Sequence, residues 1–255
     1  MGIIDQFRLD GKAALVTGSG RGLGQAMAVG LAEAGADVAG LDVISNDETA
    51  ARVQSLGQRF LSFSDNLLEA TASQLEGIVQ KVVREFGRLD ILVNNAGIIR
   101  RAPVLEFSEK DWDDVLQINL KAVFFLSQAA VRVMAAKGSG KIINVASMLS
   151  FQGGILVPSY TASKSGVAGI TRLMANELAS SGVNVNAIAP GYMATDNTAP
   201  LRANPDRAPA ILARIPAGRW GEPEDLQGVV VFLASNASDY LNGAIIPVDG
   251  GWLTR

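Results

Sequence analysis

The stretch AALVTGSGRGLGQAMAVGLAEAGADVAGLD, residues 13–42, decides the fold of this chain. An apolar run over 13–17 ends in a glycine-rich loop, Thr17-Gly18-Ser19-Gly20-Arg21-Gly22-Leu23-Gly24, which opens a helical segment. Glycines let a backbone turn tightly and approach a pyrophosphate, and a helix N-terminus offers free N–H groups. The loop lies at the strand-to-helix junction that this kind of binding requires. We therefore expect Gly18, Arg21, Gly22, Leu23 and Gly24 to bind a dinucleotide.

Asp42 ends the second apolar run and indicates which dinucleotide is bound. A carboxylate at this position can accept hydrogen bonds from the ribose hydroxyls of adenosine, and it would repel a 2′-phosphate. This favours NAD(H), with NADP(H) as the alternative. Arg21 bears on that alternative, because a basic residue in the loop can reach a 2′-phosphate. The other interpretation of Arg21, which we prefer, is a surface side chain.

The same alternation of short apolar runs and helical stretches continues along the chain. Most runs are apolar throughout, which is typical of strands in a parallel sheet covered on both faces. The pattern predicts a single-domain, doubly wound α/β Rossmann fold over residues 1–255, with a central parallel sheet of about seven strands and helices on both faces. The predicted strands are 13–17, 37–42, 59–64, 89–94, 141–147, 183–190 and 244–248. The predicted helices are 22–34, 47–56, 69–86, 109–136, 159–180 and 222–234.

Residues 192–220 interrupt this alternation. They contain Pro200, Pro205, Pro209 and Pro216 with polar residues between them, and they follow the sixth predicted strand. Ligands of open α/β sheets bind at the carboxyl ends of the strands, and a long structureless insertion in a compact domain is more often functional than idle. We predict that 192–220 is a substrate lid. The alternative is a flexible surface excursion.

The composition removes most kinds of catalytic chemistry. The 255 residues include no cysteine and no histidine, which excludes thiol nucleophiles, Ser-His-Asp catalysis and the usual zinc sites, and we expect no bound metal. The formal net charge of −3, with acidic and basic residues interspersed, offers no basic patch for nucleic acid. No signal peptide is evident, and no apolar run approaches the ~18 residues that span a bilayer. We expect a soluble, cytoplasmic protein with no membrane partner.

A general acid or base in this chain must therefore be Tyr, Lys, Asp or Glu, and Tyr160 with Lys164 is the pair that stands out. On a helix, residues i and i+4 share a face. A cation beside a tyrosine favours the phenolate and lowers a pKa that is otherwise about 10. The hydroxyl of Ser147 could hold a carbonyl oxygen against the phenol. Such a set can move a proton at a carbonyl or alcohol carbon. For the Tyr–Lys spacing alone, a solvated pair on an outer face is the alternative.

These features, in this order and at this spacing, resemble the short-chain dehydrogenase/reductase family over essentially the whole chain. The TGxxxGxG loop is 17–24, the NNAG motif is Asn94-Asn95-Ala96-Gly97, the YxxxK pair is Tyr160 and Lys164, and the PG motif is Pro190-Gly191. The resemblance implies that Tyr160 is the general acid/base and that Ser147 orients the substrate oxygen. It implies that Lys164 lowers the tyrosine pKa and binds the nicotinamide ribose, and that Asn119 holds a water linking the lysine to solvent.

The resemblance extends to the rest of the dinucleotide site. It implies that Asp65 contacts adenine, that Asn94, Ala96 and Gly97 line the adenosine side, and that the nicotinamide side is lined by Tyr160, Lys164, Pro190, Gly191, Met193 and Thr195. For Asn94 and Asn95 the alternative is a turn with side chains bonded to the backbone, and for Asn119 it is a satisfied helical amide.

Within the family, several stretches resemble dehydrogenases that act on sugar acids in pectin and uronate breakdown. They are IIRRAPVLEFSEKDWDDV, ASMLSFQGG, TRLMANE, NAIAPGYMAT and RIPAGRWGEPEDL. This implies an NAD-dependent enzyme that interconverts a hydroxyl and a ketone on a sugar acid. A guanidinium can hold a carboxylate through two hydrogen bonds, so we predict Arg101 as its partner. Gln152 and Tyr192 are predicted hydroxyl contacts beside Ser147. A pair of solvated arginines, or a contact between subunits, is the alternative for Arg100 and Arg101.

Other functions stay open. A gluconate 5-dehydrogenase or a uronate reductase shares parts of these stretches. A 3-oxoacyl-thioester reductase would need an apolar tunnel and NADPH, and Asp42 and the arginines speak against it. A dinucleotide-sensing protein without turnover often lacks the serine, tyrosine or lysine, all of which are present. The helices 109–136 and 159–180 carry broad apolar faces that pair between subunits in the family, so we expect a homotetramer; packing on the sheet alone is the alternative.

Overall fold

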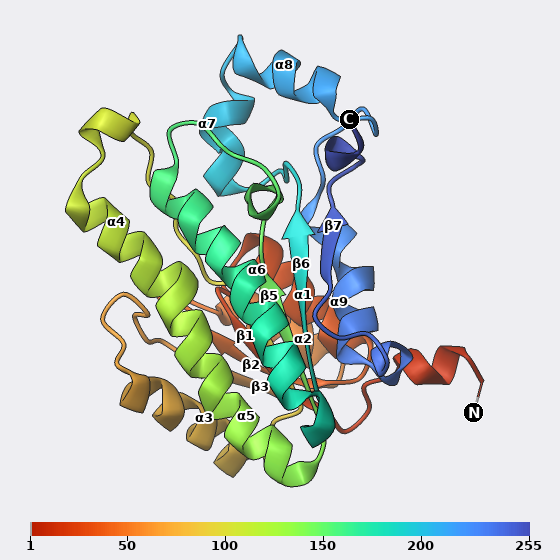
Figure 1. Cartoon of the computed structure of the whole chain (residues 1–255). Helices are drawn as coiled ribbons and strands as arrows, with labels where there is room; N and C mark the ends of the chain where they lie inside the picture. The colour runs from red at the N-terminus through yellow and green to blue at the C-terminus, as the bar shows by residue number, and fades with distance from the viewer. Residues whose placement is uncertain (1) are drawn as a thin grey trace.

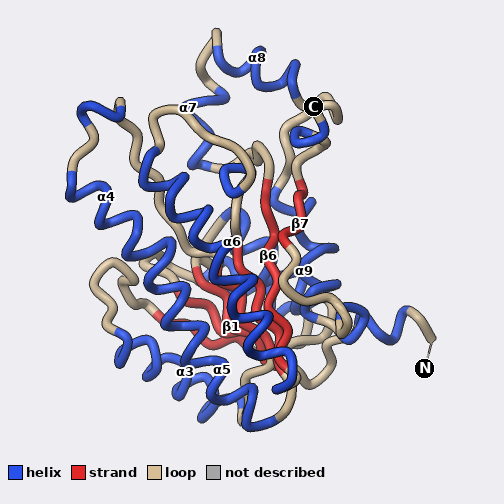
Figure 2. The backbone as a smooth tube through the Cα atoms, viewed as in Figure 1, coloured by secondary structure: helices blue, strands red, loops and turns tan. Residues whose placement is uncertain are grey.

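The computed structural model describes residues 2–255 and has one central sheet of seven parallel strands in the order β3-β2-β1-β4-β5-β6-β7 (Figures 1 and 2). The central strands β1, β4 and β5 are buried along their whole lengths, as strands covered on both faces must be. The predicted fold class is confirmed. The strands are β1 (Ala13–Thr17), β2 (Asp37–Leu41), β3 (Phe60–Phe63), β4 (Ile91–Asn94), β5 (Gly140–Val145), β6 (Val183–Pro190) and β7 (Ile245–Val248).

Helices cover both faces of the sheet (Figure 1). On one face α1, α2 and α9 pack into a core cluster that includes Leu31, Val53 and Val230. On the other face α3, α5 and α6 pack into a second cluster with Leu75, Leu126 and Met174. The helices are α1 (Gly22–Glu33), α2 (Asp47–Ser55), α3 (Ala72–Phe86), α4 (Glu109–Leu116), α5 (Val123–Lys137), α6 (Pro158–Leu178), α7 (Ala199–Arg202), α8 (Arg207–Arg214) and α9 (Gln227–Ala234).

The strand order reverses between β1 and β4, and this reversal positions the ligand site. The chain adds β2 and β3 on one side of β1, then returns to place β4 on the other side. The loops that leave the carboxyl ends of β1 and β4 therefore diverge and leave a crevice between them, where open α/β sheets bind their ligands.

Local capping interactions decide where two of the helices begin. α3 begins at Ala72 rather than at the predicted residue 69, because Thr71 and Gln74 form a capping box. The Thr71 hydroxyl accepts from the Gln74 N–H at 3.3 Å, and the Gln74 side chain accepts from the Thr71 N–H at 2.8 Å. α4 begins after Ser108, whose hydroxyl accepts from the Asp111 N–H at 3.1 Å.

The predicted helix 109–136 is interrupted at its centre. A π-helical turn, Gln117–Ala122, separates α4 from α5. Such turns are rare and occur mostly at functional sites. This one contains Asn119, which is fully buried and turned toward the sheet rather than toward solvent.

Counted as one helix, Glu109–Lys137 is long and apolar enough to cross a membrane by length and composition alone. The prediction concerned unbroken apolar runs, and Gln117, Lys121 and Arg132 interrupt this stretch. The core helix of a globular domain meets the same criterion. Here Leu126, Ala130 and Met134 are fully buried against the sheet and α3.

The sequence indicated a structureless insertion at 192–220, but this segment is structured. It contains a 3₁₀ turn, Asp196–Thr198, followed by α7 and α8. Two of its prolines lie in first turns, Pro200 in α7 and Pro209 in α8. A proline in the first turn of a helix removes an N–H that has no intrahelical partner, so it starts a helix there rather than breaking one.

Candidate active site

A cleft of about 710 Å³ lies at the carboxyl ends of the central strands. Its walls come from the glycine loop, the ends of β2 and β3, the loop after β4, the start of α6 and the stretch after β6. The predicted site residues that line it are Gly18, Arg21, Gly22, Leu23, Gly24, Asp42, Asp65, Ala96, Gly97, Arg101, Tyr160, Lys164 and Thr195. The predicted residues outside its lining are Asn94, Asn119, Ser147, Gln152, Pro190, Gly191, Tyr192 and Met193.

The glycine loop is packed so tightly that side chains could not replace two of its glycines. A Cβ on Gly24 would lie 1.9 Å from the carbonyl oxygen of Gly18, and a Cβ on Gly18 would lie 2.8 Å from the side chain of Asn95. Asn95 also ties the loop to β4, because its amide nitrogen donates to the carbonyls of Thr17 at 2.9 Å and Gly18 at 3.1 Å. The loop is therefore held rigidly against the start of α1.

Gly22 differs from these two because a Cβ added to it would make only an ordinary van der Waals contact. Its φ is +57°, and the nearest atom that a Cβ would meet is Cγ2 of Thr195, at 3.8 Å across the cleft. The first turn of α1 therefore presents bare backbone to the gap between the glycine loop and the stretch after β6. Exposed backbone N–H groups at a helix N-terminus are the kind of cradle that binds phosphate groups.

Asp42 is fixed at the end of β2. One carboxylate oxygen accepts from the N–H of Gly20 at 2.9 Å, and the other accepts from the N–H of Ile44 at 3.2 Å. Asp42 thus keeps a negative charge beside the glycine loop. The Arg21 guanidinium forms an ion pair with Asp196, at 2.7 Å, and not with Asp42. Arg21 is thus a surface side chain, as expected, but it also connects the glycine loop with the stretch after β6.

Two asparagines that resemble family site residues lie below the cleft. The side chain of Asn94 is buried and donates to Ser127 at 2.9 Å and to Asn144 at 2.8 Å, which leaves only its main chain for a ligand. Asn119 accepts from the N–H of Ile98 at 2.9 Å and donates to the carbonyl of Ile98 at 2.9 Å. For Asn119 the alternative of a satisfied helical amide describes the side chain as it stands. The alternative for Asn94 does not, because its amide bonds the side chains of Ser127 and Asn144 rather than the backbone of a turn.

Tyr160 and Lys164 lie on the first turns of α6 and face the cleft together. The ammonium of Lys164 is 5.6 Å from the centre of the Tyr160 ring and donates to the carbonyl of Val145 at 2.5 Å. Burial lowers the pKa of Lys164 to about 8. The ammonium is thus held between the end of β5 and the tyrosine without a carboxylate partner among residues 2–255.

The expected lowering of the tyrosine pKa is not observed. Burial raises the pKa of Tyr160 above its usual value, and hydrogen bonding with Ser147 and the charge of Arg101 oppose the increase only in part. The Lys164 ammonium donates to the carbonyl of Val145 rather than to the phenol. Tyr160 is therefore a neutral phenol near neutral pH. The Ser147 side chain is a hydrogen-bond partner of the phenol.

Three of the four predicted substrate residues have different surroundings. Arg101 lines the cleft and donates to the carbonyl of Asn197 at 3.2 Å, whereas its neighbour Arg100 forms an ion pair with Asp111 at 3.3 Å. Gln152 accepts from Arg214 of α8 at 3.5 Å, a long contact. Tyr192 packs edge-on against Trp220 and Trp252, with ring centres 5.5 and 4.7 Å away.

The cleft also contains residues that sequence reasoning missed. Asn95 could be seen in the sequence as part of the NNAG motif. Its side chain holds the glycine loop in place through hydrogen bonds to the carbonyls of Thr17 and Gly18. Ile44 and Asn66 follow the ends of β2 and β3, where position alone would have indicated them. Asn197 enters through its main-chain carbonyl, which no sequence pattern reveals.

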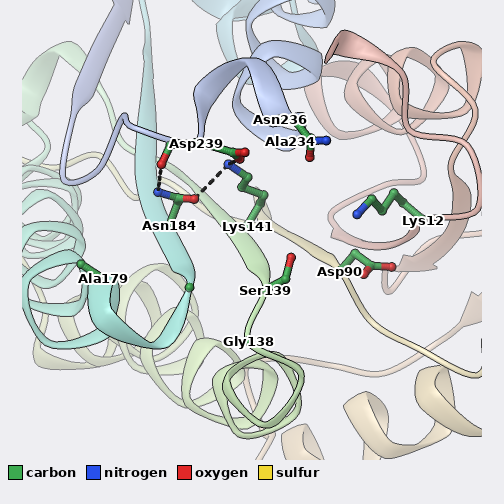
Figure 3. Close-up of a pocket in the computed structure, with 11 residues that line it drawn as sticks. Lys12, Asp90, Gly138, Ser139, Lys141, Ala179, Asn184, Ala234, Asn236 and Asp239 are labelled. Atoms are coloured by element: carbon green, nitrogen blue, oxygen red, sulfur yellow. Dashed lines mark hydrogen bonds and ion pairs between the residues drawn. The ribbon is translucent and has the colours of Figure 1, made fainter. Parts of the chain in front are cut away.

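A second polar cavity, of about 280 Å³, lies at the opposite, amino-terminal end of the strands (Figure 3). Its buried ammonium, Lys141, points toward Asn184 and Asp239 and donates to them at 2.9 and 2.7 Å. Its buried carboxylate, Asp90, accepts from the Ala13 N–H at 2.9 Å and pairs with Arg88 at 2.6 Å. Lys141 and Asp90 are therefore both paired with neighbouring side chains, and these pairs join segments at the amino-terminal end of the sheet.

The fold and the cleft define a Rossmann-type, dinucleotide-binding oxidoreductase. A family model described as Enoyl-(Acyl carrier protein) reductase matches residues 18–253. The chain is 61% identical to the curated 2-dehydro-3-deoxy-D-gluconate 5-dehydrogenase of Escherichia coli (strain K12) over 254 residues, which cover 99% of this chain and 100% of the relative. It belongs to the short-chain dehydrogenase/reductase family, as the sequence motifs predicted.

Two solved structures extend the comparison. A candidate 2-deoxy-D-gluconate 3-dehydrogenase from Agrobacterium tumefaciens with bound NADP is 54% identical, with a TM-score of 0.91 over 98% of this chain and 99% of that one. A gluconate 5-dehydrogenase from Burkholderia cenocepacia J2315 in complex with NADP and tartrate is 40% identical, with a TM-score of 0.94 over 100% of both chains. A dinucleotide cofactor is thus common to these relatives.

Proposed function

We propose that this protein is an NAD(H)-dependent dehydrogenase that interconverts a hydroxyl and a ketone on a sugar acid. The proposed activity is that of 2-dehydro-3-deoxy-D-gluconate 5-dehydrogenase, also called 2-deoxy-D-gluconate 3-dehydrogenase. The observation that carries the proposal is that Tyr160, Lys164 and Arg101 line the same cleft as the glycine loop. The full-length relatives bear out the prediction of a sugar-acid oxidoreductase made from the sequence.

The proton chemistry is assigned to Tyr160. When bound, the nicotinamide ring supplies or accepts the hydride at the carbinol carbon. In ketone reduction Tyr160 gives its hydroxyl proton to the substrate oxygen, and in alcohol oxidation the phenolate removes that proton. The raised pKa keeps Tyr160 protonated near neutral pH, which suits ketone reduction without any prior ionisation. Ser147 holds the substrate oxygen against the phenol.

Lys164 and Asn119 are assigned to proton supply. The Lys164 ammonium, held at the carbonyl of Val145, lies beside the tyrosine ring and returns a proton toward it after transfer. It also holds the nicotinamide ribose. We assign to Asn119 the binding of a water that links this lysine to solvent, and the π-helical turn around Asn119 supports a functional role.

The remaining predicted site residues, inside and just outside the cleft lining, are assigned to the dinucleotide. The glycine loop holds the pyrophosphate, Asp65 the adenine, and the main chains of Asn94, Ala96 and Gly97 the adenosine side. Pro190, Gly191, Met193 and Thr195 are assigned to the nicotinamide side. At Gly191 an added Cβ would lie 2.5 Å from the main chain of Asp249, so glycine is what allows the two segments to pack this closely.

NAD(H) is the proposed cofactor, with NADP(H) as the alternative that the solved relatives carry. The preference is argued from Asp42, whose two backbone hydrogen bonds hold a full negative charge where a 2′-phosphate would approach. The assay is kcat/KM for NADH against NADPH with one keto acid. A ratio in favour of NADPH would overturn the preference without affecting the proposed reaction.

Arg101 is assigned to the substrate carboxylate. It lies close enough to Tyr160 for its charge to act on the phenol, and it forms no ion pair with any acidic residue within 2–255. Gln152 and Tyr192 are assigned to hydroxyls, and 192–220 is proposed as the lid over them. Gluconate 5-dehydrogenase activity is the second candidate, supported by the relative that holds tartrate, a hydroxy acid.

We also propose a homotetramer that acts in the cytoplasm in pectin or uronate catabolism. A shallow hollow of about 720 Å³ runs along α4, α5 and α6 and is lined by half-buried apolar groups, among them Leu120, Phe124 and Ile170. A second copy of the chain is its proposed occupant, because helix faces of this kind lose exposed apolar area on pairing. Light scattering of the purified protein measures the mass; a monomer would exclude the assembly.

The decisive experiment combines a substrate panel with Tyr160→Phe. The panel contains 5-keto and 3-keto sugar acids, uronates and an acetoacetyl thioester, with NADH consumption as the readout. We expect turnover of keto sugar acids and a fall of about 10²- to 10⁴-fold in kcat for Tyr160→Phe, since only the proton donor is removed. Turnover of the thioester alone, or near-normal activity of the phenylalanine variant, would refute the proposal.

A further inference from the structure

The stretch after β6 leaves the sheet and returns to it through a narrow neck. Met193 pairs with Gly221 as an isolated bridge, the N–H of Ala194 donates to the carbonyl of Gly221 at 2.7 Å, and the N–H of Gly221 donates to the carbonyl of Tyr192 at 2.9 Å. Everything between, including α7 and α8, projects from this neck above the carboxyl ends of the strands (Figure 1). The first residues past the neck, 194–198, line the dinucleotide cleft.

Residues 195–198, here called the strap, form a compact unit. The Thr198 hydroxyl donates to the carbonyl of Met193 at 2.5 Å and accepts from the N–H of Thr195 at 3.2 Å. Arg202 of α7 donates to the carbonyl of Thr195 at 3.3 Å. These bonds fix the shape of the turn, so that whatever holds Asp196 or Asn197 also holds the whole strap.

Both walls of the cleft reach the strap. From the glycine loop, Arg21 forms an ion pair with Asp196 at 2.7 Å. From the loop after β4, Arg101 donates to the carbonyl of Asn197 at 3.2 Å. A Cβ added to Gly22 would lie 3.8 Å from the methyl group of Thr195, so the two walls are close together here. The ion pair between Arg21 and Asp196 spans this narrow opening, above the turn of the glycine loop that is proposed to hold the pyrophosphate.

We propose that Asp196 is a positioning residue whose ion pair with Arg21 clasps the strap over the bound dinucleotide and slows its release. The inference deepens the proposed function and rests on dinucleotide binding in this cleft. Arg21 leaves the glycine loop on one side of the pyrophosphate cradle, and Asp196 approaches from the other side. A dinucleotide that enters or leaves between the two walls must part this contact.

The expected effect is small and dependent on salt. The side chains of Arg21 and Asp196 are 66% and 70% exposed, and an exposed ion pair contributes at most about 1 kcal/mol, which is about fivefold in a rate. Salt screens such pairs, with a Debye length of about 10 Å at 0.1 M. A clasp of this kind therefore regulates the rate of release and leaves the fold intact.

The experiment measures NADH release by stopped-flow fluorescence, without turnover. We expect Asp196→Ala to release NADH about two- to fivefold faster than the unchanged protein at low salt, and the difference to vanish at high salt. Asp196→Glu should restore most of the slow release. In an Arg21→Ala background, Asp196→Ala should have no further effect, because the partner is already absent.

Asp10→Ala is the matched control. Asp10 pairs with Arg8 just before the amino-terminal end of β1, and the two side chains are 57% and 64% exposed, so the lost pair is comparable but remote from the cleft. Its release rate should equal that of the unchanged protein. The clasp is overturned if Asp196→Ala releases NADH at the normal rate or more slowly, as it would if the carboxylate only repelled the phosphates. It is also overturned if the acceleration persists in the Arg21→Ala background. Failure of the unchanged protein to bind NADH would instead refute the proposed function.

Discussion

Substitution of Gly24 by alanine tests the glycine loop most directly. The added Cβ would lie 1.9 Å from the carbonyl oxygen of Gly18 and 2.5 Å from the side chain of Asn95. Ordinary contact begins near 3.4 Å, so the Gly18 carbonyl must move by about 1.5 Å, the difference between the two distances. That carbonyl cannot move alone, because the N–H of Gly18 is bonded to Leu41 at 2.7 Å.

The cost follows from these contacts. Overpacking of a tight site costs ~1–3 kcal/mol, and the bond from Asn95 to the Gly18 carbonyl, about 1 kcal/mol, is lost as well. A total of about 3 kcal/mol corresponds to a loss of about a hundredfold in NADH affinity, if the displaced loop must return to its original shape to bind. We expect a lower Tm for the same reason.

The assay is a fluorescence titration with NADH beside a thermal melt. Gly77→Ala is the matched control, because Gly77 lies in α3 with nothing within 4 Å of an added Cβ. That change should leave the NADH Kd unchanged and stabilise the protein by about 0.5–1 kcal/mol, the helix preference of alanine over glycine. An NADH Kd within threefold of normal for Gly24→Ala, with an unchanged Tm, would refute the packing argument.

Three further predictions concern the chemistry. Ketone reduction needs a protonated Tyr160 and a protonated Lys164. Because burial lowers the pKa of Lys164 to about 8 and raises that of Tyr160, kcat/KM should be level below pH 8 and fall as pH rises above it. A profile that stays level up to pH 10 would contradict the assigned roles. Asp42→Ala removes the charge that repels a 2′-phosphate, so kcat/KM for NADPH should rise relative to NADH by about tenfold or more; an unchanged ratio would show that Asp42 does not select the cofactor. Arg101→Ala should raise KM for the keto acid by about tenfold to a hundredfold, because a charge-assisted pair with the carboxylate is lost, while the NADH Kd stays constant. The neighbouring Arg100→Ala breaks only a surface pair with Asp111 and should change neither KM nor Kd.

Local chemistry explains why the dinucleotide half of the site could be predicted. The loop 17–24 lies between a strand and a helix that are adjacent in sequence, so its position relative to both is set by a few backbone angles. Asp42 ends the next strand and pairs back onto the same loop through the N–H of Gly20. The glycine loop and its contact with Asp42 lie within one βαβ unit, and the right-handed crossover of such a unit leaves little freedom in how its two strands and helix are arranged.

The proton-transfer half could be predicted as a set of residues but not in its electrostatics. The spacing of Tyr160 and Lys164 placed them on one face of α6. The sequence predicted a tyrosine with a lowered pKa, whereas burial raises it, because the fold removes water from both side chains and directs Lys164 at the carbonyl of Val145. Desolvation depends on everything that packs around a group, which spacing along a helix does not report.

By itself, the sequence determined the parallel sheet, the glycine loop, the absence of histidine and cysteine chemistry, and the identity of the tyrosine and lysine that face the cleft. Only the tertiary structure decided that Arg21 spans the cleft to Asp196, that Asn94 and Asn119 are bonded inside the core, and that the 192–220 segment closes at a neck and folds into two short helices. The features that the sequence determined depend on residues that are close together along the chain. Those that the tertiary structure decided join residues far apart in the chain, whose distances exist only once the sheet is formed and its loops are brought to one edge.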